Sequence, residues 1–274
     1  MTTNLYLIGT PIGNLSDITQ RAIDTLKNVH TIVAEDTRVT KKLLSHYDIS
    51  KPIISFNSKN YKGKILTIQK LLKDHNVGLT TDAGTPGISD PGYELINSVE
   101  NFDVNIIPIP GASALTSAIS VSGFPINQFY FAGFAPRRES ELKNLLESTS
   151  KLNVPIIMFE SPNRIKKLLS SLGKYANQKN VLIMREMTKV YEERFYGSIK
   201  DASMHFQNPK GEITLILEPS GSSFKSLTEN EIFELISKLK SDGIDTKSIA
   251  QELTKVTNLS KSESYKKVID SKDI

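Results

Sequence analysis

The sequence predicts an α/β fold, and two features of its pattern support this class. Short apolar runs rich in Ile and Val alternate with segments of helical spacing, which is typical of a largely parallel sheet covered by helices. Loops rich in Gly and Pro follow three of the apolar runs, at residues 9–14, 81–92 and 110–113. Such loops can continue neither a strand nor a helix, so a ligand can approach their backbone closely.

The first half of the chain has the clearer alternation, and we expect it to form a domain over residues 1–122. Strands are predicted at residues 5–8, 31–34, 52–56, 77–80 and 104–108. Helices are predicted at residues 18–26, 39–46, 64–73 and 113–121, with a further one from residue 93. Ser16 or Asp17 is the expected N-cap of the first helix. Asp90 followed by Pro91 is a common helix start, so the loop before residue 93 can also be explained without a ligand.

The second half repeats the pattern, and we expect a second α/β domain over residues 126–219, with a hinge at Gly123, Phe124 and Pro125. Strands are predicted at residues 129–134, 155–159, 181–184, 192–197 and 212–217. Helices are predicted at residues 139–147 and over a segment that ends near residue 175. A stretch rich in Gly and Ser after Pro219 is expected to be a linker.

The C-terminal extension, residues 229–274, is predicted to form three short helices. Its spacing over residues 249–269 is loosely similar to that of a helix-turn-helix. However, residues 225–274 contain nine Lys and nine Asp or Glu, so this segment is neutral. Neutral charge and a poor match to the pattern argue against DNA binding by the extension.

Composition excludes several classes of function. The chain has no Cys, which excludes disulfides, a thiolate nucleophile and Cys-based zinc sites. Its four His residues are far apart in sequence, so we expect no bound metal. No apolar run approaches the roughly 20 residues that a membrane helix needs, and we expect a cytoplasmic protein without membrane contact. A net charge of +4 permits contact with nucleic acid but does not establish it.

Charged residues follow four of the predicted strands at the point where each strand ends. For each residue alone, a solvated charge or a helix cap is the ordinary explanation. In open α/β sheets, however, ligands bind beyond the carboxyl ends of the strands, so the whole set favours one shared cleft. The residues are Glu35, Asp36, Arg38, Asp82, Glu160, Arg164, Arg185, Glu186 and Lys189.

Several familiar cofactor and catalytic motifs are missing. The sequence contains no G-x-x-x-x-G-K-[ST] loop, no G-x-G-x-x-G after the first strand and no G-x-S-x-G elbow. This disfavours ordinary ATP or dinucleotide cradles and covalent catalysis. Group transfer from a donor that carries its own reactivity remains, and S-adenosylmethionine fits this requirement because its sulfonium methyl is already electrophilic.

Six segments, taken in order, resemble the motif set of the ribosomal RNA small subunit methyltransferase I family, which belongs to the tetrapyrrole methylase superfamily. The segments are residues 7–15, 34–38, 81–92, 110–114, 159–164 and 185–189. The resemblance spans about residues 5–217. It implies two α/β domains of tetrapyrrole methylase type with S-adenosylmethionine in the interdomain cleft. It also implies a homodimer that methylates the ribose 2'-hydroxyl of a cytidine in the decoding region of 16S rRNA, either in free RNA or in the small ribosomal subunit.

The resemblance also implies the residues of the donor site. They are Pro11, Gly13, Asn14, Asp82, Ala83, Gly84, Thr85, Ile88, Ser89, Ser113, Ala114, Thr116, Met158, Phe159, Glu160 and Thr214.

A ribose hydroxyl is a very weak acid, so its attack benefits from a base or a nearby cation. Lys189 is the first candidate for this role, oriented by Glu186 or Glu193, with Glu35 and Asp36 as further candidates. The expected phosphate contacts are Arg38, Arg137, Arg138, Arg164 and Arg185. The residues expected to stack on an unstacked base are Tyr191, Phe195 and Phe134.

Two alternatives remain open at this point. A small-molecule methylase of the same fold would act on a porphyrin-like acceptor, and members of that kind carry G-x-G-P-G-D in the first loop. The present chain has Asn14 where that Asp would stand, which argues against it. A non-catalytic ribosome-binding protein would bind RNA with strong salt dependence and show no affinity for the donor.

Overall fold

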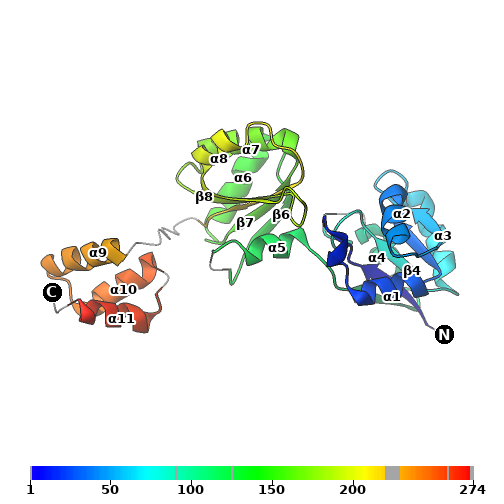
Figure 1. Cartoon of the computed structure of the whole chain (residues 1–274), viewed down its shortest axis with the longest axis horizontal. Coiled ribbons are helices and arrows are strands. Elements are labelled where there is room, and N and C mark those ends of the chain that lie inside the picture. Colours follow the sequence, from blue (N-terminus) through cyan, green and yellow to red (C-terminus); the bar gives the residue numbers. More distant parts are fainter. Residues whose placement is uncertain (1, 90–91, 125, 220–228, 258, 272–274) are drawn as a thin grey trace. The chain divides into compact units, whose positions relative to one another are not determined.

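The computed structural model describes residues 2–89, 92–124, 126–219, 229–257 and 259–271 (Figure 1). These residues form two compact units, Met1–Glu218 and Pro219–Ile274. The predicted cap at Asp90 and Pro91, the hinge residue Pro125 and residues 220–228, which include the predicted linker after Pro219, lie outside the described residues.

The first sheet is parallel throughout, as the alternating pattern predicted. Its strand order is β3-β2-β4-β1-β5, and the strands are β1 (Thr3–Ile8), β2 (Thr31–Ala34), β3 (Ile53–Ser55), β4 (Val77–Thr80) and β5 (Val104–Ile109). Because the strands are parallel, the loops after β1, β2 and β4 meet at one edge of the sheet. These are the loops that carry the Gly and Pro residues and the acidic side chains.

Helices cover both faces of the first sheet. They are α1 (Gln20–Asn28), α2 (Thr37–His46), α3 (Tyr61–Leu72) and α4 (Gly92–Val99). Helix α5 (Ala114–Ser120) follows β5 but packs against the second sheet. Successive residues of β1 point to opposite faces, so Leu5 and Leu7 pack with α3 and α4, whereas Tyr6 and Ile8 pack with α1 and α2.

The predicted cap of α1 is wrong. A short 3₁₀ turn, η1 (Leu15–Asp17), precedes the helix, and the side chain of Asn14 accepts a hydrogen bond from the backbone N–H of Ser16 in that turn. The N-cap of α1 is Thr19, whose hydroxyl accepts a bond from the N–H of Ala22 at 3.1 Å. Thr19 was overlooked because Ser and Asp upstream are equally good caps by residue type.

The second sheet is mixed, with strand order β6-β7-β10-β8-β9. Its strands are β6 (Tyr130–Phe134), β7 (Ile156–Glu160), β8 (Asn180–Arg185), β9 (Glu193–Ser198) and β10 (Ile213–Leu217). β6 and β7 are parallel, and the other neighbours are antiparallel. Strand β10, last in sequence, lies in the middle of the sheet and brings Thr214 beside Phe159.

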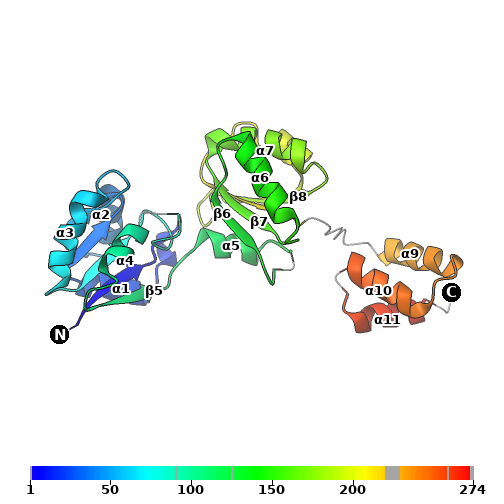
Figure 2. The ribbon, with the colours of Figure 1, turned by 180° about the vertical axis from the view of Figure 1, so that it is seen from behind.

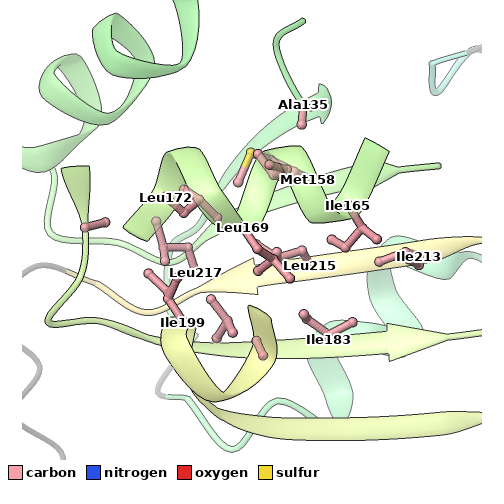
Figure 3. Close-up of a cluster of buried hydrophobic side chains, with 14 of the residues drawn as sticks. Ala135, Met158, Ile165, Leu169, Leu172, Ile183, Ile199, Ile213, Leu215 and Leu217 are labelled. Atoms are coloured by element: carbon pink, nitrogen blue, oxygen red, sulfur yellow. The ribbon is translucent and has the colours of Figure 1, made fainter. Parts of the chain in front are cut away.

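Three helices pack on one face of the second sheet, and α5 packs on the other. Helices α6 (Glu139–Ser150), α7 (Pro162–Tyr175) and α8 (Ile199–His205) share a core with β7, β8 and β10 (Figures 1 to 3). The opposite face buries Ile157, Leu182 and Ile216 against Ala118 of α5 and Ile12 of the first loop. Helix α8 was not predicted, because it has only seven residues and little periodicity.

The described residues of the C-terminal unit form three helices, as predicted: α9 (Glu229–Ser241), α10 (Thr246–Val256) and α11 (Lys261–Asp270). They share a small core that includes Ile236, Leu253 and Val268. Ser260 begins α11 with a capping box, in which its hydroxyl and the Glu263 carboxylate exchange bonds with backbone N–H groups.

None of the helices that the structure describes is both long and apolar enough to cross a membrane. Within the same residues, His, Asp and Glu side chains form no group of three that could hold a metal ion.

Replacing Leu215, fully buried in the second sheet, by Ala should lower the free energy of unfolding by about 2–5 kcal/mol, because it leaves a cavity. Urea unfolding followed by circular dichroism measures this change. The control is Met204→Ala on α8, where the side chain is 61% exposed and the expected change is below about 0.5 kcal/mol. Equal changes in the free energy of unfolding for the two variants would contradict the position of Leu215 in the core.

Candidate active site

A cavity of about 340 Å³ lies among the loops at the ends of the strands of both sheets. This volume is within the range of small-molecule sites. Most residues predicted for the donor site line it: Asp82, Ala83, Gly84, Thr85, Ile88, Ser89, Ser113, Ala114, Phe159, Glu160 and Thr214. Glu35 and Phe134, which were predicted for other roles, also line it.

Other predicted donor residues lie outside the lining of this cavity. Met158 is fully buried in the core of the second sheet, because it alternates with Phe159 along β7 and therefore faces α7 (Figure 3). Thr116 is exposed on α5, and Asn14 caps the turn η1. Pro11 and Gly13 flank Ile12, which is the residue of that loop that reaches the cavity.

Several lining residues were not predicted as site residues. Ile12, Thr81, Ser161 and Pro162 are neighbours of predicted residues within the same motifs, so the motif boundaries could have found them. Ile213 and Glu212 stand beside Thr214 at the start of β10, and Met187 stands in the loop after β8. Met187 lies within the motif at residues 185–189, so that motif could have found it. Nothing in the local sequence marks Glu212, since its position depends on how β8 and β10 pair.

Three carboxylates lie together where β2 and β4 end. The N–H of Asp36 donates to Asp82 Oδ1 at 2.9 Å, and the hydroxyl of Thr81 donates to Glu35 Oε2 at 2.7 Å. Burial, followed by the neighbouring negative charges of Glu35 and Asp36, raises the pKa of Asp82. Asp36 has a different role, because it caps α2 and pairs with Arg38 Nη2 at 2.6 Å, which holds its pKa at about 2.

Glu160 forms the opposite wall. Its Oε1 accepts a bond from the N–H of Ser161 at 2.7 Å, and its Oε2 lies 3.1 Å from Arg164 Nη2. Burial raises the pKa of this carboxyl despite the nearby arginine. Arg164 also donates to the carbonyl of Ala135 at 2.8 Å, so its guanidinium is bound within the protein.

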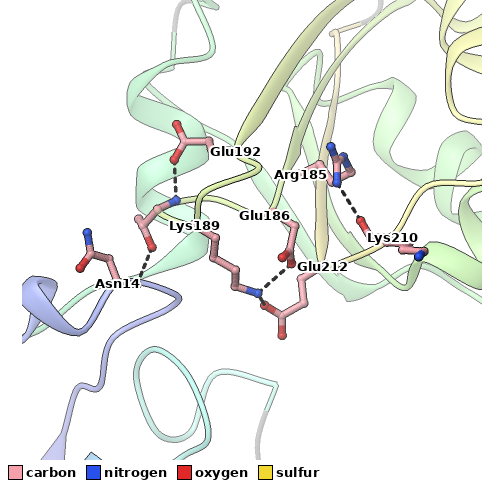
Figure 4. A network of polar contacts seen from close by, with 8 residues as sticks. Asn14, Arg185, Glu186, Lys189, Glu192, Lys210 and Glu212 are labelled. Atoms are coloured by element: carbon pink, nitrogen blue, oxygen red, sulfur yellow. Dashed lines mark hydrogen bonds and ion pairs between the residues drawn. The ribbon is translucent and has the colours of Figure 1, made fainter. Parts of the chain in front are cut away.

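Lys189 is not among the residues that line the cavity, but its side chain lies between two carboxylates, and one of them, Glu212, does line it (Figure 4). Its Nζ donates to Glu186 Oε1 at 2.7 Å and to Glu212 Oε2 at 2.9 Å. Burial by itself would lower the pKa of Lys189, but these two bonds outweigh burial and raise that pKa. The bond from Lys189 correspondingly lowers the pKa of Glu186. Lys189 is therefore an ammonium cation at neutral pH.

The backbone holds Glu186 in an uncommon conformation. Its φ is +52°, in the left-handed region that few side chains adopt. The N–H of Glu186 donates to the carbonyl of Glu212 at 2.9 Å, and the N–H of Glu212 donates to Glu186 Oε1 at 3.0 Å. A Cβ on Gly211 would lie 2.2 Å from Glu186 Cδ, so only glycine leaves room for this carboxylate.

The loop that carries Lys189 also packs against the first loop of the chain. A Cβ on Gly13 would lie 2.5 Å from Lys189 Cγ and 2.8 Å from the carbonyl oxygen of Met187. The N–H of Asn14 donates to the hydroxyl of Thr188 at 3.0 Å. The predicted orientation of Lys189 by Glu193 does not occur in the structure, because Glu193 pairs with Arg185 at 2.6 Å and with His205 at 2.5 Å instead.

The predicted RNA-contacting side chains fall into two groups. The side chains of Arg38 and Arg138 are 86% and 81% exposed, and Arg137 is also exposed. Arg164 and Arg185 are mostly buried and hydrogen-bonded to backbone carbonyls, the latter to that of Lys210 (Figure 4).

The three predicted stacking residues also differ in position. Tyr191, two residues after Lys189 in the sequence, is 74% exposed. Phe134 lines the cavity and makes an edge-to-face contact with Phe159. Phe195 packs against Phe206 and the core of the second sheet, which leaves its ring unsuited to stacking on a base.

Comparisons with known proteins identify the family. Residues 4–203 match the family model described as tetrapyrrole (corrin/porphyrin) methylases. Proteins named ribosomal RNA small subunit methyltransferase I match along most of the chain. The protein from Thermotoga maritima is 47% identical over 78% of this chain and 97% of its own length, and that from Synechocystis is 37% identical over 95% of both.

The chain belongs to the ribosomal RNA small subunit methyltransferase I family. It also belongs to the tetrapyrrole methylases, so the resemblance based on six motifs is confirmed. Two solved structures share the fold at low identity. The methyltransferase CobJ has a TM-score of 0.61 at 13% identity, covering 80% of this chain and 95% of CobJ. Uroporphyrin III C-methyl transferase from Thermus thermophilus has a TM-score of 0.57 at 15% identity, and the match covers 78% of this chain and 97% of that protein.

The chain is a methyltransferase, and its methyl donor is S-adenosylmethionine. The cavity suits this donor, which carries a sulfonium and an ammonium group. Asp82 and Glu160 supply carboxylates, Ile12 and Phe159 supply apolar surface, and among the described residues no Lys or Arg lines the cavity. A site without basic side chains favours a cationic ligand over a phosphate-bearing one.

The Gly211→Ala variant should lower the rate of methyl transfer by roughly tenfold or more, because the added methyl displaces Glu186 and removes one anchor of Lys189. Transfer from labelled S-adenosylmethionine measures the rate. Gly243→Ala is the matched control, since Gly243 also has a positive φ, +77°, but no described atom within 4 Å of the new methyl. Full activity of Gly211→Ala would show that transfer does not depend on the position of Glu186.

Proposed function

We propose that this methyltransferase transfers the methyl group of S-adenosylmethionine to the ribose 2'-hydroxyl of a cytidine in the decoding region of 16S rRNA, within the small ribosomal subunit. The observation that carries the proposal is the match, along nearly the whole chain, to a protein named ribosomal RNA small subunit methyltransferase I. The cavity geometry supports it through a fixed cation beside a carboxylate-lined donor site.

The chemistry divides between the donor and the chain. S-adenosylmethionine supplies an electrophilic methyl group. The chain binds the donor through Asp82 and the apolar residues of the cavity and holds the acceptor hydroxyl in line with the methyl. Lys189 stabilises the negative charge that develops on the attacking oxygen. The raised pKa of Lys189 supports this cationic role over that of a general base.

Glu186 and Glu212 hold the Lys189 ammonium in position, and Glu186 Oε1 also accepts a bond from the N–H of Glu212. Asp36 is a poor base because Arg38 holds its pKa at about 2. Glu35, which lines the cavity, is the remaining predicted residue for accepting the proton of the hydroxyl.

RNA contacts are assigned to the exposed arginines Arg38, Arg137 and Arg138, with Tyr191 stacking on the base beside the target ribose. Arg164 and Arg185 support the site from within the protein. We further propose a cytoplasmic homodimer and domain boundaries at residues 1–122, 126–219 and 229–274.

The direct test is transfer of labelled methyl to small ribosomal subunits that lack the modification, with free 16S rRNA as the parallel acceptor. Label in 2'-O-methylcytidine is the expected result, with the subunit as the better acceptor. Label only in a porphyrin-type acceptor would favour the small-molecule methylase. Salt-dependent binding of subunits without donor affinity would favour a non-catalytic ribosome-binding protein.

Lys189→Ala should lower the rate of transfer at saturating donor and subunit by about 10²–10³-fold, the range for removing one charge-stabilising donor. Lys189→Arg should retain much more activity, because arginine keeps the charge and cannot act as a base. The control is Lys200→Ala, which removes an exposed charge on α8 and should leave the rate of transfer unchanged. An inactive Lys189→Arg beside a stable fold would instead indicate that Lys189 must lose its proton.

A further inference from the structure

We propose that a second cavity, on the other side of Glu160 from the donor site, binds a backbone phosphate of the RNA strand through Arg137 and Lys167. This inference rests on the proposed function, because it assigns a contact to the same RNA. The cavity measures about 280 Å³ and lies between α6 and α7. Its walls include Arg137 before α6, Leu142 on α6, and Arg164, Lys167 and Ser171 on α7.

The charges around this cavity leave two cations unmatched. Both carboxylates in the walls already have basic partners: Glu160 pairs with Arg164 at 3.1 Å, and Glu139 binds Lys174 at 3.0 Å. Tyr175 also donates to Glu139 at 2.8 Å.

Within the described part of the chain, neither Arg137 nor Lys167 has an ion pair. Both are nevertheless close enough to act electrostatically on the carboxylates of the walls, Lys167 on Glu139 and Arg137 on Glu160. The cavity therefore attracts an anion.

The construction of the cavity strengthens this attraction. Leu142 and Leu168 are buried in its floor, and apolar walls increase the electrostatic interaction between a bound anion and the two cations. Helix α6 begins at this point, and its first turn already carries Glu139 and Glu141, so the two cations and not the helix dipole provide the attraction.

The position relative to the donor site identifies the anion. Glu160 lines both cavities, so only this side chain and its neighbours separate them. A strand whose target ribose enters the donor cavity has phosphates on either side of that ribose. One of them can occupy the second cavity and fix the register of the strand, which is the usual role of phosphate contacts.

The experiment compares Arg137→Ala, Lys167→Ala and the double variant with the wild type. The acceptor is small ribosomal subunits that lack the modification, at several KCl concentrations. The double variant should raise the KM for subunits by roughly tenfold, with kcat and the Kd for S-adenosylmethionine unchanged. The slope of log KM against log salt should fall by about 0.7–0.9 for each cation removed. Lys167→Arg should restore most of the affinity.

The matched control is Lys166→Ala, which removes an exposed charge from the adjacent position of α7, outside the cavity. A double variant that behaves like Lys166→Ala overturns the assignment, as does a loss of kcat or donor affinity at unchanged KM. Inorganic phosphate at constant ionic strength should raise the KM of the wild type but not that of the double variant. Phosphate that alters donor affinity instead would identify a free-anion site. If the wild type itself labels no subunits, the proposed function fails and not only this contact.

Discussion

The active site depends on the close approach of two loops that are about 175 residues apart in sequence. Gly13 in the first loop leaves no space for a side chain against Met187, Thr188 and Lys189. This contact, with the bond between Asn14 and Thr188, joins the end of β1 to the end of β8. Ile12 of the first loop, which lines the cavity, therefore lies beside the loop of the mixed sheet that carries Lys189.

Electrostatics then divides the acidic side chains of the site into two kinds. Burial raises the pKa of Asp82 and Glu160, which are two of the carboxylates that line the cavity. Basic partners lower the pKa of Asp36 and Glu186, which act in capping a helix and in holding Lys189. Environments that push pKa values apart in this way mark different roles for residues of the same type. The sequence lists all four side chains alike as acids at the ends of strands.

Local pattern was enough to predict most of the elements and the fold class. Strand β2 coincides with its prediction because a run of β-branched residues is bounded by polar ones. Helix α8 and the cap at Thr19 were missed because short helices and competing caps give weak local signals. The mixed pairing of the second sheet also lay beyond local pattern, since strand direction depends on contacts distant in sequence.

The sequence by itself determined the family and the donor, and it marked the loops that line the cavity, because glycine, proline and acidic residues at the ends of strands are constrained locally. Only the tertiary structure decided what each charged side chain does. Met158 faces the core, Arg164 is bound to Glu160 and a backbone carbonyl, and Glu212 reaches Lys189 across paired strands. The physical reason is that pKa, ion pairing and burial depend on neighbours in space, which β10 brings together only when it inserts into the middle of its sheet.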